Sequence, residues 1–265
     1  MSQAWPPLSA ARLRLSRQLQ HARGRAANRQ FLAEGPQCVR EALAFGDVRL
    51  VITGPHPTAE SVVLAQAADR QGLAVAAASE EEWAAITDTT HGQGVVAVCG
   101  LPALTLDDVV APRLVLVLDE VRDPGNVGTL IRTADAFGAA AVLASAGTAE
   151  VWAPKCVRAS VGSVFHLPLV TGLDLADVVA WANRHDLTTL GADTSGRRLD
   201  DVRPALERPT AWVVGNEAQG LPPDHLSLLD EAVTVPMWGR AESLNVASAA
   251  AICLYETALA QNCAP

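Results

Sequence analysis

The sequence predicts an α/β protein of two domains, and three features support this prediction. Apolar runs without polar alternation, such as RLVLVL (113–118), indicate strands buried on both faces. Amphipathic stretches between these runs indicate helices that cover a parallel sheet. The segment LPALTLDDVVAP (101–112) has proline near both ends and two acidic residues, as is typical of a linker. We therefore predict a small α/β domain over 1–105 and a larger one with a parallel sheet over 106–265.

The first half of the chain after the N-terminal segment alternates between strand and helix patterns. Short apolar runs predict strands, and longer stretches with helical spacing predict helices. The strands are expected over 49–54, 73–79 and 94–100, and the helices over 58–72 and 79–88. These elements predict a compact α/β unit that ends near Gly100.

A new alternation of strand and helix patterns starts at Arg113. Strands are expected over 113–118, 139–145, 188–192, 210–215 and 232–237, and a helix over 126–138. A further helix, which follows Asn245, is apolar or small nearly all round as far as Glu256, and such a composition predicts a buried helix. Parallel sheets of this kind bind ligands in the loops at the carboxyl ends of their strands.

Composition limits the class of protein. The chain has 265 residues, of which 49% are hydrophobic, and no apolar run is long enough for a secretory signal or a membrane span. The five cysteines are widely spaced without a CxxC motif or a Cys/His cluster, so we expect no metal site. We therefore predict a cytoplasmic protein with no membrane partner.

The net charge of −9 is unevenly distributed. Residues 1–33 contain no acidic residue but six arginines, at 12, 14, 17, 23, 25 and 29, so the remainder carries −15. A basic segment on an acidic protein predicts contact with a polyanion such as a nucleic acid, and we expect Arg25, Asn28 and Arg29 to touch its phosphates. The alternative is a solvated amphipathic helix without a binding role.

The first of three polar loops is DPGN, before the helix at 126–138. Asn126 is expected to cap this helix, and Arg132 is expected on its polar face, early in the helix and away from the buried stripe. An arginine near a helix N-terminus is disfavoured by the helix dipole. A structural salt bridge to Asp135 or Asp123 is the alternative to a role in binding.

The other two loops also follow strands. GNEAQG begins at Gly215 and contains Asn216, Glu217 and Gly220, so its glycines allow a close approach of backbone or ligand. In AESLNVASAA (241–250), Ser243 and Asn245 lie on either side of Leu244 at what is expected to be a buried helix entrance. A simple strand-to-helix connection and a helix cap are the respective alternatives.

Taken in order, DPGNVGTLIRTADAFG, VVGNEAQGL and VPMWGRAESLNVASAAAICLYE resemble the three signature motifs of the SpoU (TrmH) family of RNA ribose 2′-O-methyltransferases, which belong to the SPOUT class. The resemblance extends over residues 113–260. The stretches RGRAANRQFLAEGPQCVREAL and THGQGVVAV are similar to the family's substrate-binding domain, which resembles ribosomal protein L30e.

The resemblance implies a C-terminal trefoil knot that forms the pocket for S-adenosylmethionine, and a homodimer with active sites near the interface. It implies that a set of residues from the second and third loops lines the cofactor pocket: Gly215, Asn216, Gly220, Val235, Met237 and Leu244. It also matches a second set to the family's active-site positions: Asn126, Arg132, Glu217, Ser243 and Asn245. No metal is implied.

The function expected from this resemblance is methylation of a ribose 2′-hydroxyl in structured RNA, most of all 23S ribosomal RNA. A guanidinium hardly deprotonates, so Arg132 is expected to clamp a phosphate and stabilise the developing alkoxide, with Glu217 orienting it. A tRNA 2′-O-methyltransferase is one alternative. A non-catalytic RNA-binding or ribosome-assembly factor is another, although intact Arg132, Glu217 and Asn245 argue against it.

Overall fold

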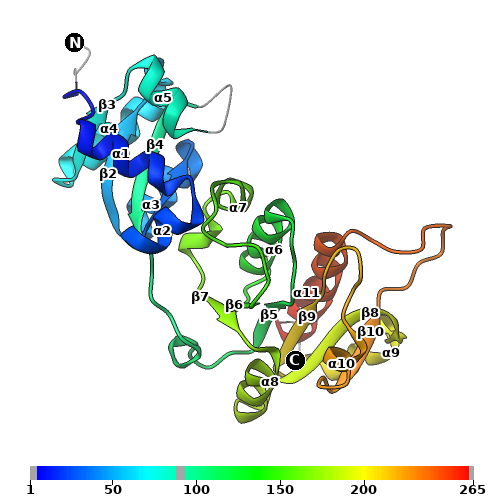
Figure 1. The fold of residues 1–265 in the computed structure, drawn as a ribbon. Coiled ribbons are helices and arrows are strands. Elements are labelled where there is room, and N and C mark those ends of the chain that lie inside the picture. The colour runs from blue at the N-terminus through cyan, green and yellow to red at the C-terminus, as the bar shows by residue number, and fades with distance from the viewer. Residues whose placement is uncertain (1–4, 88–92, 263–265) are drawn as a thin grey trace. The chain divides into compact units, whose positions relative to one another are not determined.

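The computed structural model describes residues 5–87 and 93–262, and the chain forms two compact units (Figure 1). Unit 1 comprises Met1–Ala103 and Trp152–His166, and unit 2 comprises Leu104–Val151 and Leu167–Pro265. In the described part of the chain, no helix is long and apolar enough to cross a membrane. Each unit has its own sheet and core.

Unit 1 is built on a four-stranded sheet in the order β1-β4-β2-β3. Its strands are β1 (Gln30–Glu34), β2 (Val48–Thr53), β3 (Ala74–Ala77) and β4 (Val95–Gly100). Its helices are α1 (Ala10–Leu19), α2 (Ala22–Asn28), α3 (Pro36–Phe45), α4 (Ala59–Arg70), α5 (Glu80–Ile86), α7 (Pro154–Ser160) and the short η2 (Ser163–Phe165). The strands expected at 49–54, 73–79 and 94–100 are present as β2, β3 and β4, whereas β1 was not predicted.

The segment Trp152–His166 belongs to unit 1 through its contacts, although it lies far along the chain. Arg158 forms an ion pair of 2.9 Å with the buried carboxylate of Glu34. The ring of Trp152 lies 4.7 Å from that of Phe31, measured between centroids. Because these contacts join β1 to a segment more than a hundred residues away, a boundary drawn along the sequence does not separate the two units.

Unit 2 contains a six-stranded sheet in the order β10-β8-β9-β5-β6-β7, in which every pairing is parallel. The strands are β5 (Leu114–Leu118), β6 (Ala141–Ser145), β7 (Leu169–Leu173), β8 (Thr188–Arg198), β9 (Thr210–Val214) and β10 (Glu231–Thr234). The predicted parallel sheet is confirmed. Two features were not predicted: β7, and the extension of β8 beyond residue 192 through polar residues.

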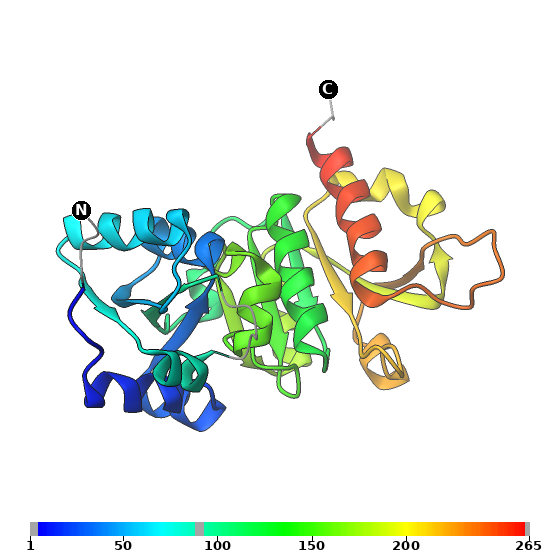
Figure 2. The same cartoon turned by 90° about the horizontal axis from the view of Figure 1, so that it is seen from above.

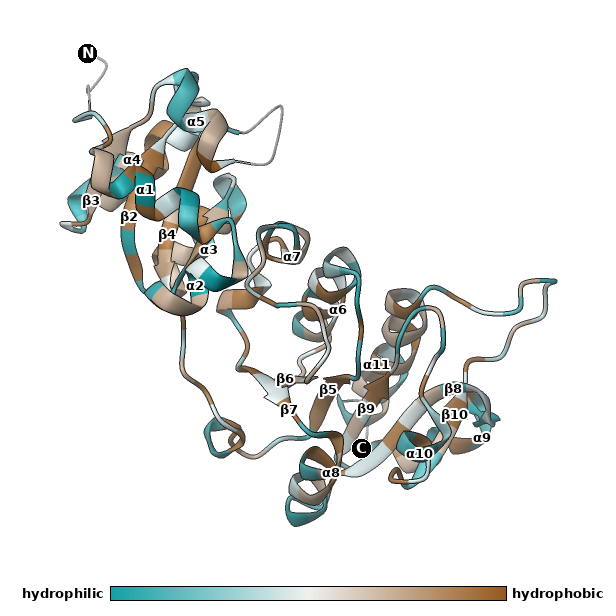
Figure 3. Cartoon of the chain, in the orientation of Figure 1, coloured by the Kyte–Doolittle hydropathy of each residue, from teal (hydrophilic) through white to brown (hydrophobic). Residues whose placement is uncertain are grey.

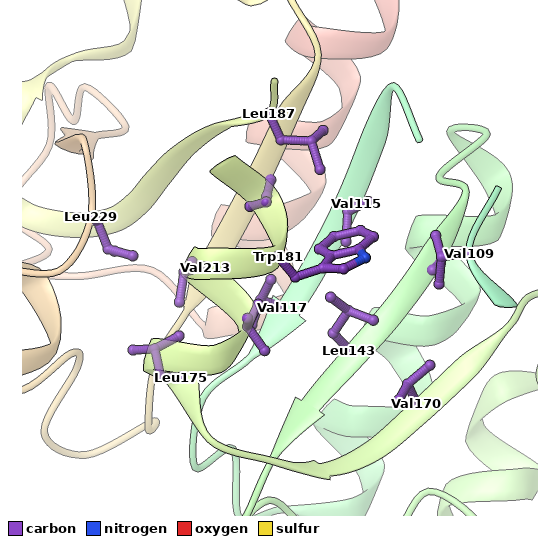
Figure 4. Close-up of a cluster of buried hydrophobic side chains, with 14 of the residues drawn as sticks. Val109, Val115, Val117, Leu143, Val170, Leu175, Trp181, Leu187, Val213 and Leu229 are labelled. Atoms are coloured by element: carbon purple, nitrogen blue, oxygen red, sulfur yellow. The ribbon is translucent and has the colours of Figure 1, made fainter. Parts of the chain in front are cut away.

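Helices cover both faces of this sheet. They are α6 (Pro124–Ala136), α8 (Leu175–Arg184), α9 (Leu199–Val202), α10 (Pro223–Leu226) and α11 (Val246–Asn262), with the short η1 (Leu106–Asp108) and η3 (Arg203–Glu207). Figure 4 shows Trp181 of α8 packed against Val115, Val117 and Leu143 of the central strands. Since successive side chains of a strand point to opposite faces, Trp212 of β9 points away from α8.

Trp212 instead faces α11. Its indole nitrogen donates a hydrogen bond of 2.8 Å to the hydroxyl of Thr257, and both residues are fully buried. Helix α11, red in Figure 2, packs beside α6, and the rings of Tyr255 and Phe137 lie 5.8 Å apart between centroids. Helices α6 and α11 therefore share the face of the sheet opposite α8.

The expectation that α11 is wholly buried is wrong for the single chain. Ile252 and Tyr255 are 38% and 50% exposed, on a helix whose other side is buried against the sheet. The hydropathy colouring of Figure 3 likewise shows apolar character along α11. The composition failed to predict this because a helix that is apolar all round can meet water on the side that its own sheet does not cover.

Candidate functional site

The middle of β8 and the loops at the carboxyl ends of β9 and β10 enclose a cavity of about 480 Å³ in unit 2. This is the edge of a parallel sheet at which ligands bind, and the volume lies in the usual range for small-molecule sites. The six residues expected to bind a cofactor all line it: Gly215, Asn216, Gly220, Val235, Met237 and Leu244. The active-site candidates Glu217, Ser243 and Asn245 line it too.

Two glycines shape the loop that follows β9. A Cβ at Gly215 would lie 2.5 Å from the backbone of Gly220, so no larger residue fits without a shift of the main chain. Gly220 adopts a φ of +68°, which L side chains rarely adopt. The backbone N–H of Gly220 donates to the carbonyl of Asn216 at 2.8 Å. These constraints close residues 216–220 into a tight loop at one side of the cavity.

Asn216 fixes this loop from within. Its Oδ1 accepts hydrogen bonds from the backbone N–H groups of Ala218 at 2.9 Å and Gln219 at 3.3 Å. Its Nδ2 donates to the carbonyl of Glu120, after β5, at 3.1 Å. The side chain of Asn216 thereby orders its own loop and attaches it to the end of the neighbouring strand.

Glu217 joins two of the predicted loops. Its carboxylate accepts hydrogen bonds from the backbone N–H groups of Arg122 at 3.1 Å and Asp123 at 3.0 Å, and from Nδ2 of Asn126 at 3.0 Å. Partial burial opposes ionisation, but hydrogen bonds from Asn126 and from backbone N–H groups outweigh it and lower the pKa of Glu217. Glu217 therefore remains a carboxylate at neutral pH.

The sequence suggested that Asn126 caps α6, but in the structure it does not. The helix begins at Pro124 and its N-cap is Asp123, whose side chain accepts from the backbone N–H of Asn126 at 3.0 Å. Proline is well suited to the first helical position, which moves the cap one residue before it. The side chain of Asn126 is thus available to Glu217, and its Oδ1 accepts from Nδ2 of Asn245 at 3.3 Å.

Asn245 connects this network to α11. Its Oδ1 accepts from the backbone N–H of Ala247 at 2.9 Å, so it caps the helix, while its amide nitrogen contacts Asn126. Ser243 lines the cavity beside it. The expectation of a buried entrance is wrong, because Ser243, Leu244 and Asn245 are exposed in the single chain. Glu217, Asn126 and Asn245 thus form one hydrogen-bonded chain across the three predicted loops.

Arg132 lies apart from this network. It is exposed on α6 and does not line the cavity, and it forms no hydrogen bond or ion pair with the residues that the structure describes. The alternative of a salt bridge to Asp135 or Asp123 is therefore wrong. Since α6 begins at Pro124, Arg132 is the ninth of its 13 residues, so the expected conflict with the dipole at the N-terminus does not arise.

One side of the cavity was not predicted. Ala192, Asp193 and Thr194 line it from within β8, and Asp193 accepts hydrogen bonds from the backbone and hydroxyl of Ser195 at 2.9 and 2.6 Å. The polar residues that follow the apolar run at 188–192 could have indicated this side of the cavity, since ligand sites follow strands. They were overlooked because the sequence pattern ended the strand at residue 192, and the residues after it were not considered.

A pair of ionisable groups lies beside the same loops. Nδ1 of His225 on α10 is 2.6 Å from Oδ2 of Asp119, which follows β5 and is 2% exposed. The hydrogen bond with Asp119 raises the pKa of His225, although desolvation opposes the shift. The pair attaches the far end of the loop after β9 to the end of β5.

The predicted RNA-binding residues of unit 1 differ in accessibility. Arg25 is 3% exposed and its guanidinium donates to the carbonyl of Leu19 at 2.8 Å, so it is not placed to contact a phosphate. Asn28 is half-buried and donates to the carbonyl of Gly24 at 2.8 Å. Arg29 is exposed in the left-handed conformation that ends α2, with a φ of +53°. Arg14, Arg17 and Arg23 are exposed as well.

Within residues 5–87 and 93–262, no group of three or more His, Cys, Asp or Glu side chains could hold a metal ion. The cysteines at 38, 99, 156 and 253 are free thiols and buried. Burial raises the pKa of Cys38 to about 11 and that of Cys253 to about 12, so neither is a thiolate at neutral pH.

Comparison with known proteins agrees with this architecture. Residues 113–255 match the model of the SpoU rRNA Methylase family, and residues 11–97 match the MRM3-like substrate binding domain. The chain is 37% identical over 230 residues to the 23S rRNA (guanosine(2553)-2′-O)-methyltransferase RlmP of Bacillus subtilis, covering 85% of this chain and 87% of that protein.

Solved structures give the same result. The SpoU methyltransferase AviRb of Streptomyces viridochromogenes superposes with a TM-score of 0.82 and 28% identity, covering 95% of this chain and 97% of AviRb. An AdoMet-bound rRNA methyltransferase of Sinorhizobium meliloti gives a TM-score of 0.80 and 28% identity, covering 96% and 97% of the two chains. With its family model matched over 143 residues, this chain belongs to the SpoU rRNA methylase family.

Proposed function

We propose that this protein transfers a methyl group from S-adenosylmethionine to a ribose 2′-hydroxyl of 23S ribosomal RNA. The observation that carries the proposal is the hydrogen-bonded chain of Glu217, Asn126 and Asn245 at the cavity. Three loops that are distant in sequence converge there, and each contributes one member. The RlmP relative, whose name gives the same reaction class on 23S rRNA, supports the substrate.

The cavity fits S-adenosylmethionine in size and charge. Its only charged lining residues, within the described chain, are Asp193 and Glu217, and two carboxylates complement a ligand that carries a sulfonium and an ammonium group. Apolar side chains such as Val214, Val233 and Met237 offer surface for an adenine ring. Gly215, Asn216, Gly220, Val235, Met237 and Leu244 would hold the cofactor.

The bound cofactor supplies an electrophilic methyl group on a positively charged sulfur. The protein must then align the attacking oxygen and assist loss of its proton. Glu217 holds Asn126 and the turn before α6 by hydrogen bonds, while Asn245 and Ser243, which line the cavity, would flank the ribose. Arg132 clamps a phosphate of the substrate and stabilises the developing alkoxide, because a guanidinium is a poor base and a good donor.

A homodimer would bring Arg132 to the site. The exposed apolar side of α11, with Ile252 and Tyr255, adjoins α6 through the contact of Tyr255 with Phe137. Arg132 is exposed on α6 and does not line the cavity of its own chain. We infer that the sides of α6 and α11 form the interface between two copies and that Arg132 acts at or across it.

Unit 1 is proposed to bind the RNA. Its similarity to the MRM3-like substrate binding domain supports this role, as does the acid-free basic segment at its start. With Arg25 buried, the phosphate contacts fall to the exposed arginines, among them Arg14, Arg17 and Arg29. The likeness of this unit to L30e, the trefoil knot of unit 2 and a cytoplasmic location remain predictions of the same proposal.

The test is to map ribose methylation in a strain that lacks the gene. Total RNA from the deletion and parent strains would be compared by primer extension at limiting nucleotide concentration, which stops at 2′-O-methylated positions. The proposal expects one 23S position to lose its stop and to regain it on complementation. A change confined to tRNA would show that the substrate is tRNA and not 23S rRNA. Unchanged methylation in every RNA would contradict enzyme activity in vivo.

A further inference from the structure

Trp238 is the most exposed large apolar side chain that the structure describes, with 83% of its surface accessible. It lies in the loop between β10 and α11, where neighbouring residues 239–245 are exposed as well. An indole in water contributes nothing to the core of unit 2, and exposed apolar surface commonly marks a place of contact. The fold itself gives no reason for tryptophan here.

The position of Trp238 is set by its neighbour. Met237 lines the cavity, and adjacent Cα atoms are about 3.8 Å apart, so the backbone of Trp238 lies next to the cavity lining, although Trp238 itself does not line it. A Cβ added at the next residue, Gly239, would meet nothing within 4 Å, so the loop projects into open space at this point. The exposed indole is therefore within reach of a molecule that is bound beside the cavity.

The charge around Trp238 favours a nucleic acid as that molecule. Arg240 is exposed two residues away and forms no hydrogen bond or ion pair within the described chain. The exposed Glu242 is the one acidic residue of the loop, and it is not paired with Arg240. An aromatic face beside a guanidinium is the combination that proteins use to bind unpaired nucleotides, one group for the base and one for the phosphate.

We propose that the indole of Trp238 stacks on a nucleobase of the RNA next to the ribose that is methylated, and that Arg240 contacts a phosphate of the same strand. This inference rests on the proposed function. Because every base presents a π face, stacking of this kind orients the nucleotide without reading its identity. Trp238 is thus a positioning residue that would hold the 2′-hydroxyl at the mouth of the cavity.

A second copy of the chain is the competing occupant of this surface. The side of α11 that carries Ile252 and Tyr255 offers two exposed apolar residues one turn apart on a helix, which suits a protein interface. Trp238 is a single aromatic residue two positions from Arg240, which has no partner within the described chain. The observations therefore favour RNA at Trp238, and an oligomeric measurement distinguishes the two.

The experiment compares Trp238→Ala, Trp238→Leu and Trp238→Phe in single-turnover methylation of unmodified 23S rRNA transcribed in vitro. Loss of one stacking contact predicts a rate at subsaturating RNA that falls about tenfold or more for alanine and leucine, and a smaller loss for phenylalanine, which keeps a ring. Val110→Ala removes another exposed apolar side chain, 81% accessible, and should keep the wild-type rate. S-adenosylmethionine affinity should not change in any variant.

Equal rates for all three Trp238 variants and the wild type would overturn the inference, as would dissociation of a dimer on replacement by alanine. A second readout does not depend on turnover. Trp83, Trp152, Trp181 and Trp212 are buried and Trp5 is half-buried, so acrylamide should quench Trp238 most strongly of the six, and RNA should shield that part of the emission. The spectrum of Trp238→Phe, which lacks this indole, identifies the part of the emission that comes from Trp238. If the wild type fails to methylate RNA, the proposed function fails, while shielding by RNA would still support the contact.

Discussion

The carboxylate of Glu217 lies 3.0 Å from the side-chain nitrogen of Asn126, which joins two loops 91 residues apart in the sequence. The same carboxylate binds the backbone N–H groups of Arg122 and Asp123. One side chain therefore holds the whole turn before α6 in place. Because Asn126 also contacts Asn245, the position of the loop before α11 depends on Glu217 as well.

Glu217→Gln should reduce turnover by about a hundredfold, on the order of losing one preorganised group, because a neutral amide cannot accept three donors as a carboxylate does. The folded pKa of Glu217 is lowered, so the ionised carboxylate should stabilise the site fully at pH values above its unfolded pKa, near 4.5. This stabilisation, and the turnover that depends on it, should fade as pH falls through the lower folded pKa. Single-turnover rates from acid to neutral pH check this. A glutamine variant with the wild-type rate would remove Glu217 from the site.

Gly215→Ala should abolish cofactor binding or weaken it strongly. The new Cβ would lie 2.5 Å from the backbone of Gly220, and backbone cannot move aside as a flexible side chain can. Isothermal titration with S-adenosylmethionine measures the effect, and a thermal melt shows whether the variant is folded. Gly239→Ala, where the added Cβ meets nothing, is the control for stability. Wild-type affinity in Gly215→Ala would mean that the tight loop is not part of the cofactor site.

His225→Asn should destabilise the protein by about 1–3 kcal/mol at pH 6, because it leaves the buried carboxylate of Asp119 without its charged donor. The folded pKa of His225 is raised, so this stabilisation is fully present below the unfolded value of about 6.5 and is lost as pH rises through the higher folded value. Wild type and variant should therefore converge in stability at alkaline pH.

Denaturant melts from pH 5 to 9 check the Asp119–His225 pair. His56→Asn is the matched control, since His56 pairs with Glu80 at the surface and is 86% exposed in its side chain, where an ion pair is worth little. A gap between wild type and His225→Asn that grows with pH would contradict the sign of the argument.

Arg132→Ala should reduce turnover by about a hundredfold or more while costing less than about 1 kcal/mol of stability, because the side chain is exposed and unpaired within the described chain. Arg132→Lys should restore only part of the rate, because a point charge does not reproduce the planar guanidinium. Single-turnover methylation beside thermal melts gives both quantities, and S-adenosylmethionine affinity should stay the same. Near-normal turnover in the alanine variant would exclude the proposed role.

Arg25 and Arg29 should behave differently. Arg25→Ala should destabilise unit 1, because it leaves the carbonyl of Leu19 without its donor and opens a gap at a buried site. Arg29→Ala should leave stability nearly unchanged but weaken RNA binding and flatten its salt dependence, as expected for a phosphate contact. Filter binding across a salt series, with melts of both variants, separates the two effects. An unchanged salt dependence of RNA binding in Arg29→Ala would show that Arg29 is a solvated side chain without a phosphate contact.

Sequence reasoning was successful where function depends on loops that follow strands. Gly215, Gly220, Met237 and Leu244 were assigned to one pocket from motif resemblance, and they line one cavity. The parallel sheet followed from apolar runs such as the one at 113–118, of which Leu114–Leu118 are buried in β5. Local pattern was sufficient there because burial on both faces leaves a direct signature in composition.

Other features depended on contacts that no local pattern encodes. Arg25 lies in an acid-free segment like its neighbours, yet it alone of the six arginines is buried, because of how α2 packs. The contact of His225 with Asp119 joins residues 106 positions apart. The exposed side of α11 was missed because composition does not reveal which part of an apolar helix its own chain leaves uncovered.

The central claim is transfer of a methyl group to a ribose oxygen. Unmodified 23S rRNA transcribed in vitro would be incubated with the protein and S-adenosylmethionine labelled in its methyl group, digested to nucleosides and analysed by mass spectrometry. The account predicts label in a single 2′-O-methylnucleoside, with the mass shift on the sugar fragment, and about a hundredfold slower labelling with Glu217→Gln under matched conditions. Label on the base fragment, or none with the folded wild-type protein and intact RNA, would contradict it.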